Sequence, residues 1–159
     1  METVVFEVPG EPIGKARPRV VDGHAYTPSK TKAYEQAVRL AYKQAVKDRP
    51  EPERRWDKDA QLSLQIAAFY QLPKRVSRQM RGAMLRWEER PKKKPDLDNI
   101  LKIVADALND LAYHDDSQIV HMHASKYWSL TPSVTVTICE VSRAPRLSYK
   151  SRGGKNDEL

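Results

Sequence analysis

Apolar side chains recur along this chain with two periods, one typical of strands and one typical of helices. Every second residue is apolar in residues 3–8, through Val4, Phe6 and Val8, and again in residues 62–70. A period of two places these side chains on one face of a sheet, so both segments are predicted to be strands. Further strands are predicted over residues 118–128 and 133–141, and a short hairpin over residues 20–26.

Three other segments show the 3.6-residue period of an amphipathic helix. They are residues 30–47, with Ser29 as the predicted N-cap, residues 74–89, and a stretch that begins at Leu97. The predicted buried faces are Tyr34, Val38, Ala41 and Ala45; then Val76, Met80, Met84 and Trp87; then Leu97, Leu101, Val104, Leu108 and Leu111. This order of elements predicts an α+β fold, in which a small mixed sheet packs against two or three helices.

The chain length and the positions of its loop-forming residues indicate one domain followed by a tail. The 159 residues of the chain are typical of a single domain. Residues 9–19 and 49–59 are rich in prolines and charged side chains and are predicted to be loops. We predict a domain over residues 1–141 and a basic tail over residues 142–159. The single cysteine excludes an intrachain disulfide, and no apolar stretch reaches the roughly 20 residues that span a bilayer. These features predict a cytoplasmic protein.

The acidic residues are concentrated in one segment. Between Asp96 and Asp116 there are six aspartates, no glutamate and one lysine, Lys102. This segment has a formal charge of −5 in a chain of net charge +7, so the remainder carries +12. A basic chain favours a polyanion such as nucleic acid. Clustered carboxylates repel one another unless a cation such as Mg²⁺ offsets their charge. Together these features predict metal-assisted chemistry on a nucleic-acid backbone.

The motif inside this segment is Asp96-Leu97-Asp98-Asn99, followed across one helix by Asp115-Asp116. The positive end of a helix favours ionised carboxylates, and a turn after the helix can return a third aspartate to the first two. Lys102 lies one turn after Asp98, where it could contact a phosphate or stabilise transition-state charge. Ordinary helix capping and an ordinary i,i+4 ion pair are alternatives that the spacing leaves open.

Other known sites that contain a similar aspartate motif are excluded by particular residues of this chain. An EF-hand loop requires a glycine at its sixth position, where this chain has Leu101. A P-loop is absent, and the element order does not supply the parallel sheet of an aspartate-nucleophile phosphatase. His114, His121 and His123 lack the further ligands of a zinc site, so packing or phosphate contact is the favoured interpretation of the last two. A nuclease site remains.

Separated blocks of the sequence follow a pattern seen in one known family. They are Pro9-Gly-Glu-Pro-Ile-Gly-Lys15-Ala-Arg17-Pro-Arg19, Lys32-Ala-Tyr34-Glu35, Lys94-Pro-Asp96-Leu-Asp98-Asn99-Ile-Leu-Lys102-Ile-Val-Ala-Asp106, and Asp115-Asp116-Ser-Gln118. In order and spacing they closely resemble the RusA family of Holliday junction resolvases, which are small, dimeric, Mg²⁺-dependent endonucleases of bacteria and their phages. The resemblance covers residues 3 to 140 and leaves the tail outside it.

By position, the resemblance implies that Asp96, Asp98 and Asp116 bind metal and act in catalysis, and that Lys102 is the catalytic lysine. Asp115 matches an adjacent carboxylate and is a further candidate ligand. The resemblance also implies Mg²⁺ as the cofactor, with Mn²⁺ as a substitute ion, no small-molecule cofactor, and a mixed α/β protomer that forms a homodimer. A two-fold dimer presents two equivalent centres to the two strands that must be nicked in a four-way junction.

Basic residues beside these blocks are the predicted DNA contacts: Lys15, Arg17, Arg19, Lys92, Lys93 and Lys94. The first three alternate along an irregular segment, so an extended chain projects them to one side. We expect sequence-independent contacts with phosphates. The predicted function is the resolution of four-way DNA junctions by paired nicking. A less selective branched-DNA or flap endonuclease and a non-catalytic nucleic-acid-binding accessory protein are the rival hypotheses.

Overall fold

The structure is a computed structural model that describes residues 3–142, without the side chains of Arg19, Val21 and Tyr26. The predicted basic tail therefore lies almost wholly outside the described residues. The strands are β1 (Thr3–Pro9), β2 (Arg19–Val21), β3 (His24–Tyr26), β4 (Leu62–Gln71), β5 (Ile119–Ser129) and β6 (Ser133–Glu140). The helices are α1 (Ser29–Val46), α2 (Arg78–Leu85) and α3 (Leu97–Leu108), with 3₁₀ turns η1 (Glu51–Glu53) and η2 (Asp116–Gln118).

Four strands form one mixed sheet in the order β1-β6-β4-β5, which confirms the predicted α+β fold. The pairs β1–β6 and β6–β4 are antiparallel, whereas β4 and β5 are parallel neighbours. Parallel neighbours cannot be joined by a tight turn and need a crossover connection. Here the crossover contains α2, α3 and the whole acidic segment. The predicted site therefore lies on the connection that joins two neighbouring strands of the sheet.

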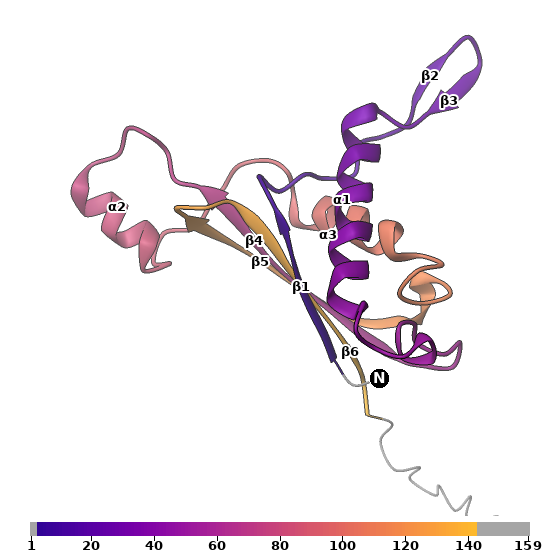
Figure 1. The fold of residues 1–159 in the computed structure, drawn as a ribbon. Helices are drawn as coiled ribbons and strands as arrows, with labels where there is room; N and C mark the ends of the chain where they lie inside the picture. The colour runs from indigo at the N-terminus through magenta and orange to yellow at the C-terminus, as the bar shows by residue number, and fades with distance from the viewer. Residues whose placement is uncertain (1–2, 143–159) are drawn as a thin grey trace, which may run out of the picture.

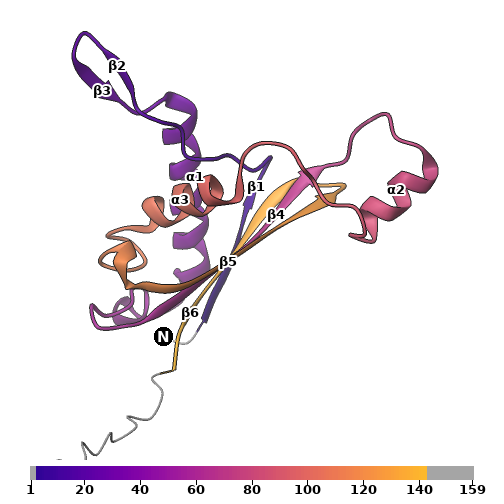
Figure 2. The same cartoon turned by 180° about the vertical axis from the view of Figure 1, so that it is seen from behind.

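Helices α1 and α3 cover one face of the sheet, while α2 and the hairpin β2–β3 project from the body in different directions (Figures 1 and 2). The core lies between the sheet and the two covering helices. In β1, Val4, Phe6 and Val8 are buried and alternate with exposed residues, as their spacing predicts. Tyr42 of α1 packs edge-on against Phe6, with ring centroids 5.7 Å apart. No helix within residues 3–142 is both long enough and apolar enough to cross a membrane.

Two predicted helices differ in their details. Pro28, rather than Ser29, is the N-cap residue of α1, and no side chain caps this helix end. The helix predicted over residues 74–89 is shorter, because Ser77 caps it by accepting a hydrogen bond from the Met80 amide. The predicted inner face is wrong at Met80 and Trp87, which are 42% and 48% exposed. Trp87 has a φ of +62°, so the helix has already ended there.

The helix predicted from Leu97 is confirmed, but its buried face is rotated from the predicted stripe. Ile100, Ile103 and Ala107 are buried, whereas Leu97 and Leu101 are only partly so. The reason is that α3 packs against both the sheet and α1, which buries a wider arc than one stripe. The opposite side exposes Asp98 and Lys102, as predicted.

Candidate functional site

Asp96 and Asp98 lie at the start of α3, on the crossover between β4 and β5. Asp96 is the N-cap residue in extended conformation, and its backbone carbonyl accepts a hydrogen bond from Ile100 N at 3.2 Å. Its carboxylate does not cap the helix but pairs with the Lys94 ammonium. Asp98, in the first turn, is exposed. Because a helix rises about 1.5 Å per residue, Lys102 lies about 6 Å beyond Asp98 along the axis of α3.

The irregular segment 10–18 holds the start of α3 in place. The Lys15 amide donates a hydrogen bond to the Asn99 carbonyl at 2.9 Å. Gly14 sits so close to the helix that a Cβ built on it would lie 2.8 Å from Pro95 Cβ and 2.9 Å from Asn99 Cβ. From the other side, the Tyr70 hydroxyl donates to the Pro95 carbonyl at 3.1 Å. The backbone that carries Asp96 and Asp98 is therefore fixed by two separate parts of the fold.

Gly14→Ala is expected to destabilise the protein by about 1–3 kcal/mol, because the new methyl group must push backbone-anchored atoms apart. The free energy of unfolding, measured in urea, tests this. Gly82→Ala is the matched control, since its Cβ would meet only the end of the flexible Arg86 side chain. In the middle of α2 that change is expected to be neutral or to stabilise by up to about 1 kcal/mol. Equal stability of the two variants would contradict the tight contact at Gly14.

Asp116 is held beside α3 by a turn with several internal hydrogen bonds. Asp115 caps η2 by accepting a hydrogen bond from Ser117 N at 2.8 Å, and Gln118 Oε1 accepts one from His114 N at 2.8 Å. Hydrogen bonds from Ser117 to the Asp115 carboxylate lower the pKa of Asp115. Partial burial and the negative charges of Asp115 and Asp106 raise the pKa of Asp116, against the opposing effect of Lys102. The turn thus returns Asp116 to the polar face of α3.

The three predicted metal ligands have suitable chemistry, but their side chains are not grouped around one position where a metal ion could bind. Aspartate oxygens are hard donors of the kind that Mg²⁺ binds. Within residues 3–142, however, no three His, Cys, Asp or Glu side chains are grouped so that they could hold one metal ion. Asp96 is neutralised by Lys94 instead, and this exposed pair would have to open for a metal to bind. The metal-binding roles of Asp96, Asp98 and Asp116 therefore stay predictions.

Lys15 has partners that its sequence context did not suggest. Its ammonium lies 2.5 Å from Glu35 Oε1 of α1 and 3.0 Å from Asp106 Oδ2 of α3. Burial acts to lower the pKa of Lys15, but these two carboxylates outweigh it and the pKa is raised. A phosphate contact would have to replace these ion pairs. No local pattern links three residues so far apart in sequence, so sequence reasoning missed the cluster.

Lys126 of β5, unlike Lys15, is a residue that the sequence did not single out. Its ammonium donates a hydrogen bond to the Lys93 carbonyl at 2.7 Å, and Arg90 Nη1 donates to the Lys126 carbonyl at 3.0 Å. Burial lowers the pKa of Lys126, against the opposing charge of Asp96. The segment that leads into Asp96 is thereby fastened to β5.

The other predicted DNA contacts differ in whether their side chains already have a partner within the protein. Arg17 is exposed and makes no ion pair with another described residue, whereas Lys92 pairs with Glu89 at 3.1 Å. The Lys93 ammonium lies 5.4 Å from the Tyr70 ring centroid. The side chain of Arg19 is not among those that the structure describes. His121 and His123 are exposed, and they contact Ser63 at 3.2 Å and Ser125 at 3.3 Å respectively.

The crossover between β4 and β5 carries an acidic segment with aspartates at a helix start, and the rest of the chain is basic, which favours a polyanion such as nucleic acid. The sequence model of the family described as "Endodeoxyribonuclease RusA" matches residues 9–139. The chain therefore belongs to the RusA family of Holliday junction resolvases and is an endodeoxyribonuclease.

Two relatives extend this result. The chain is 38% identical over 148 residues to the "Uncharacterized protein YqaN" of Bacillus subtilis (strain 168), a match that covers 89% of this chain and 99% of that protein. It is 31% identical over 91 residues to the "Crossover junction endodeoxyribonuclease rusA" of Lactococcus phage r1t. That second match covers 57% of this chain and 63% of the phage protein.

Proposed function

We propose that this protein resolves four-way DNA junctions by Mg²⁺-dependent nicking of two opposed strands. The observation that carries the proposal is the family match over residues 9–139, which spans the whole acidic segment. The basic character of the rest of the chain supports a branched DNA substrate, because a charge of +12 outside that segment favours a polyanion.

In the proposed mechanism, Asp96, Asp98 and Asp116 would hold the metal beside the scissile phosphate. When bound, Mg²⁺ would polarise the phosphoryl oxygen and favour deprotonation of the attacking water. The water oxygen forms a new bond to phosphorus while the bond from phosphorus to the 3′ oxygen breaks, and the leaving oxygen takes up a proton. Lys102, exposed on the same face as Asp98, offsets the negative charge that develops on the phosphoryl group. The products are a 5′-phosphate and a 3′-hydroxyl that a ligase can rejoin.

We further propose that two copies act as a homodimer. A two-fold axis relates the two strands that must be cut in a symmetrical junction, and an isologous dimer repeats one site across the same symmetry. Sedimentation equilibrium should give twice the mass of one chain, about 36 kDa from the 18.2 kDa of the protomer. A monomer that resolves junctions by paired nicks would contradict this part of the proposal.

The proposal is tested by cleavage of a synthetic four-way junction, a replication fork and a linear duplex of the same sequence, each with Mg²⁺ and with EDTA. We expect the junction to be cut at least about tenfold faster than the duplex, which corresponds to about 1.4 kcal/mol of selective binding to the transition state. We also expect paired nicks in opposed strands and no product in EDTA. Equal cleavage of fork and junction would favour the branched-DNA endonuclease, and binding without any nicking would favour the accessory protein.

A further inference from the structure

A cleft of about 950 Å³ reaches Pro95, the residue before Asp96, and has no role in the mechanism above. Its walls come from three parts of the chain that are distant in sequence: the segment around Arg17, the first turn of α1 at Lys30 and Thr31, and the segment that ends at Lys94 and Pro95. Pro95, at the end of this wall, immediately precedes Asp96, so one end of the cleft borders the candidate active site. We name it the Arg17–Lys30 cleft.

The Arg17–Lys30 cleft gathers positive charge. Arg17, Lys30, Lys93 and Lys94 all line it, against one acid, Glu11. The Glu11 carboxylate is already engaged, since Oε1 accepts a hydrogen bond from Gln71 N at 3.0 Å. Arg17 and Lys30 are exposed and form no ion pair with any residue from 3 to 142, so both cations are available to a ligand.

The helix end in the wall adds to this charge. The α1 N-terminus enters the cleft at Lys30 and Thr31, and no side chain caps it. Uncapped first-turn amides and the helix dipole favour an anion at this position. On its own a helix end decides little, but here it faces the same cleft as the unpaired Arg17 and Lys30 side chains. All of these groups are suited to phosphate oxygens.

We propose that the Arg17–Lys30 cleft binds the phosphodiester backbone of the DNA strand that continues from the scissile phosphate, with Arg17 and Lys30 as its two principal phosphate contacts. This inference rests on the proposed function for the identity of the strand. The volume is that of a small-molecule site, roughly 300–1,000 Å³. A cleft of this size can hold a short stretch of one DNA strand. In this proposal the cleft sets the direction in which the cut strand leaves the candidate active site.

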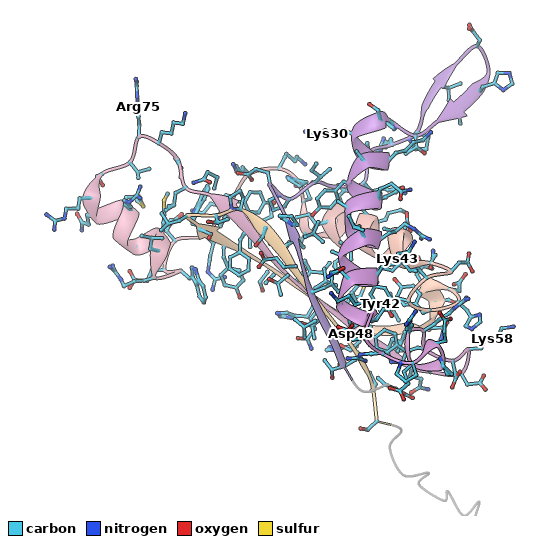
Figure 3. All side chains as sticks on the ribbon, viewed as in Figure 1. Lys30, Tyr42, Lys43, Asp48, Lys58 and Arg75 are labelled. Carbon is cyan, nitrogen blue, oxygen red and sulfur yellow. The ribbon has the colours of Figure 1, made fainter. Side chains whose placement is uncertain are left out.

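The test compares two doubly substituted proteins that lose the same charge. The first carries Arg17→Met and Lys30→Met. The matched control carries Lys43→Met and Lys47→Met, two exposed lysines near the other end of α1, and Figure 3 shows Lys30 and Lys43 toward opposite ends of this helix. Junction binding is measured by fluorescence anisotropy in EDTA, where no cleavage is expected, over a range of salt concentrations.

Removing one phosphate contact should reduce the slope of log K against log salt by about 0.7–0.9. We therefore expect the cleft variant to have a slope shallower than the wild type by about 1.4–1.8, and the control to keep the wild-type slope within about 0.5. Identical slopes and affinities for the two variants would overturn the proposal. An equal decrease in the affinity of both would also overturn it, because it would show only non-specific attraction.

A crosslink then places the contact along the strand. Lys30→Cys in a Cys139→Ser background is combined with junctions that carry a thiol tether on single, defined phosphates. Disulfide formation is expected at phosphates adjacent to the cleaved bond and not in the middle of an arm; the reverse pattern would refute the placement. If the salt slope of junction binding depends on the cleft residues but the wild type never cuts, the proposed function fails and only phosphate binding in the cleft stands. If it cuts normally and the cleft variant matches the control, the cleft alone is refuted.

Discussion

Asp96→Asn is expected to slow cleavage of a four-way junction by about 10³-fold or more, while junction affinity stays within about threefold of the wild type. The physical reason is that an amide is a neutral and weaker metal donor than a carboxylate, and a metal supplies several kcal/mol of transition-state stabilisation. Folding should not suffer. Asn is as good an N-cap residue as Asp, and the Lys94–Asp96 pair that the substitution removes is an exposed one of little value to stability.

Asp110→Asn is the control for this prediction. It makes the same chemical change in the same acidic segment, but Asp110 lies beyond the end of α3 and is 84% exposed at its side chain. Cleavage rates of both variants are measured under single-turnover conditions, and Mn²⁺ binding is measured by calorimetry. Loss of Mn²⁺ binding only in Asp96→Asn would tie the rate defect to the metal. A wild-type cleavage rate in Asp96→Asn would show that the site has been assigned wrongly.

Residues whose partners are close in sequence were the ones that the sequence could predict. The alternation in β1 and the polar face of α3 follow from local periodicity, and both are present in the structure. Asp96 and Asp98 could likewise be placed at a helix start because the apolar period begins beside them. The turn after α3 was expected to return an aspartate of the Asp115-Asp116 pair, and the family pattern selected Asp116; this return depends on the η2 turn and not on any period.

Errors arose where packing between distant segments decides the outcome. The buried arc of α3 could not be centred from its own sequence, because both α1 and the sheet press on it. Two of the three tryptophans, Trp56 and Trp128, are core residues at 2% and 8% exposure, whereas Trp87 is half exposed. Trp87 lies beyond the end of α2 and contacts Tyr127 of β5, with ring centroids 4.7 Å apart, so a distant strand sets its environment.

The candidate site shows the same division. Alternating basic residues in an irregular segment suggested three equivalent phosphate contacts, but Lys15 is held by Glu35 and Asp106. Arg17, two residues later, is free to contact a ligand. Their different surroundings follow from how residues 10–18 cross α3, which is a tertiary contact. Lys30 and Lys126 were missed for the same reason, since only the fold brings Lys30 to the same cleft as Pro95 and Lys126 within reach of the Asp96 charge.

Lys102→Met is expected to reduce the cleavage rate by about 10²–10³-fold, corresponding to about 3–4 kcal/mol of transition-state stabilisation. Lys102 is exposed on the polar face of α3 and acts on Asp116, where its charge opposes the raised pKa of that carboxyl group. Methionine has nearly the helix propensity of lysine and a similar length, so α3 should remain folded. Single-turnover cleavage and the salt dependence of binding are both measured.

Two further variants make this prediction decisive. Lys102→Arg keeps the charge and should recover part of the rate, although the guanidinium presents its donors with a different geometry. Lys43→Met, the same change on an exposed position of α1, should cleave like the wild type. If Lys102 were only a phosphate anchor, Lys102→Met would weaken binding and lower the salt slope by about 0.7–0.9 without changing the rate of bound junction. A catalytic role requires the opposite pattern, in which the rate of the bound junction falls and its affinity is nearly unchanged.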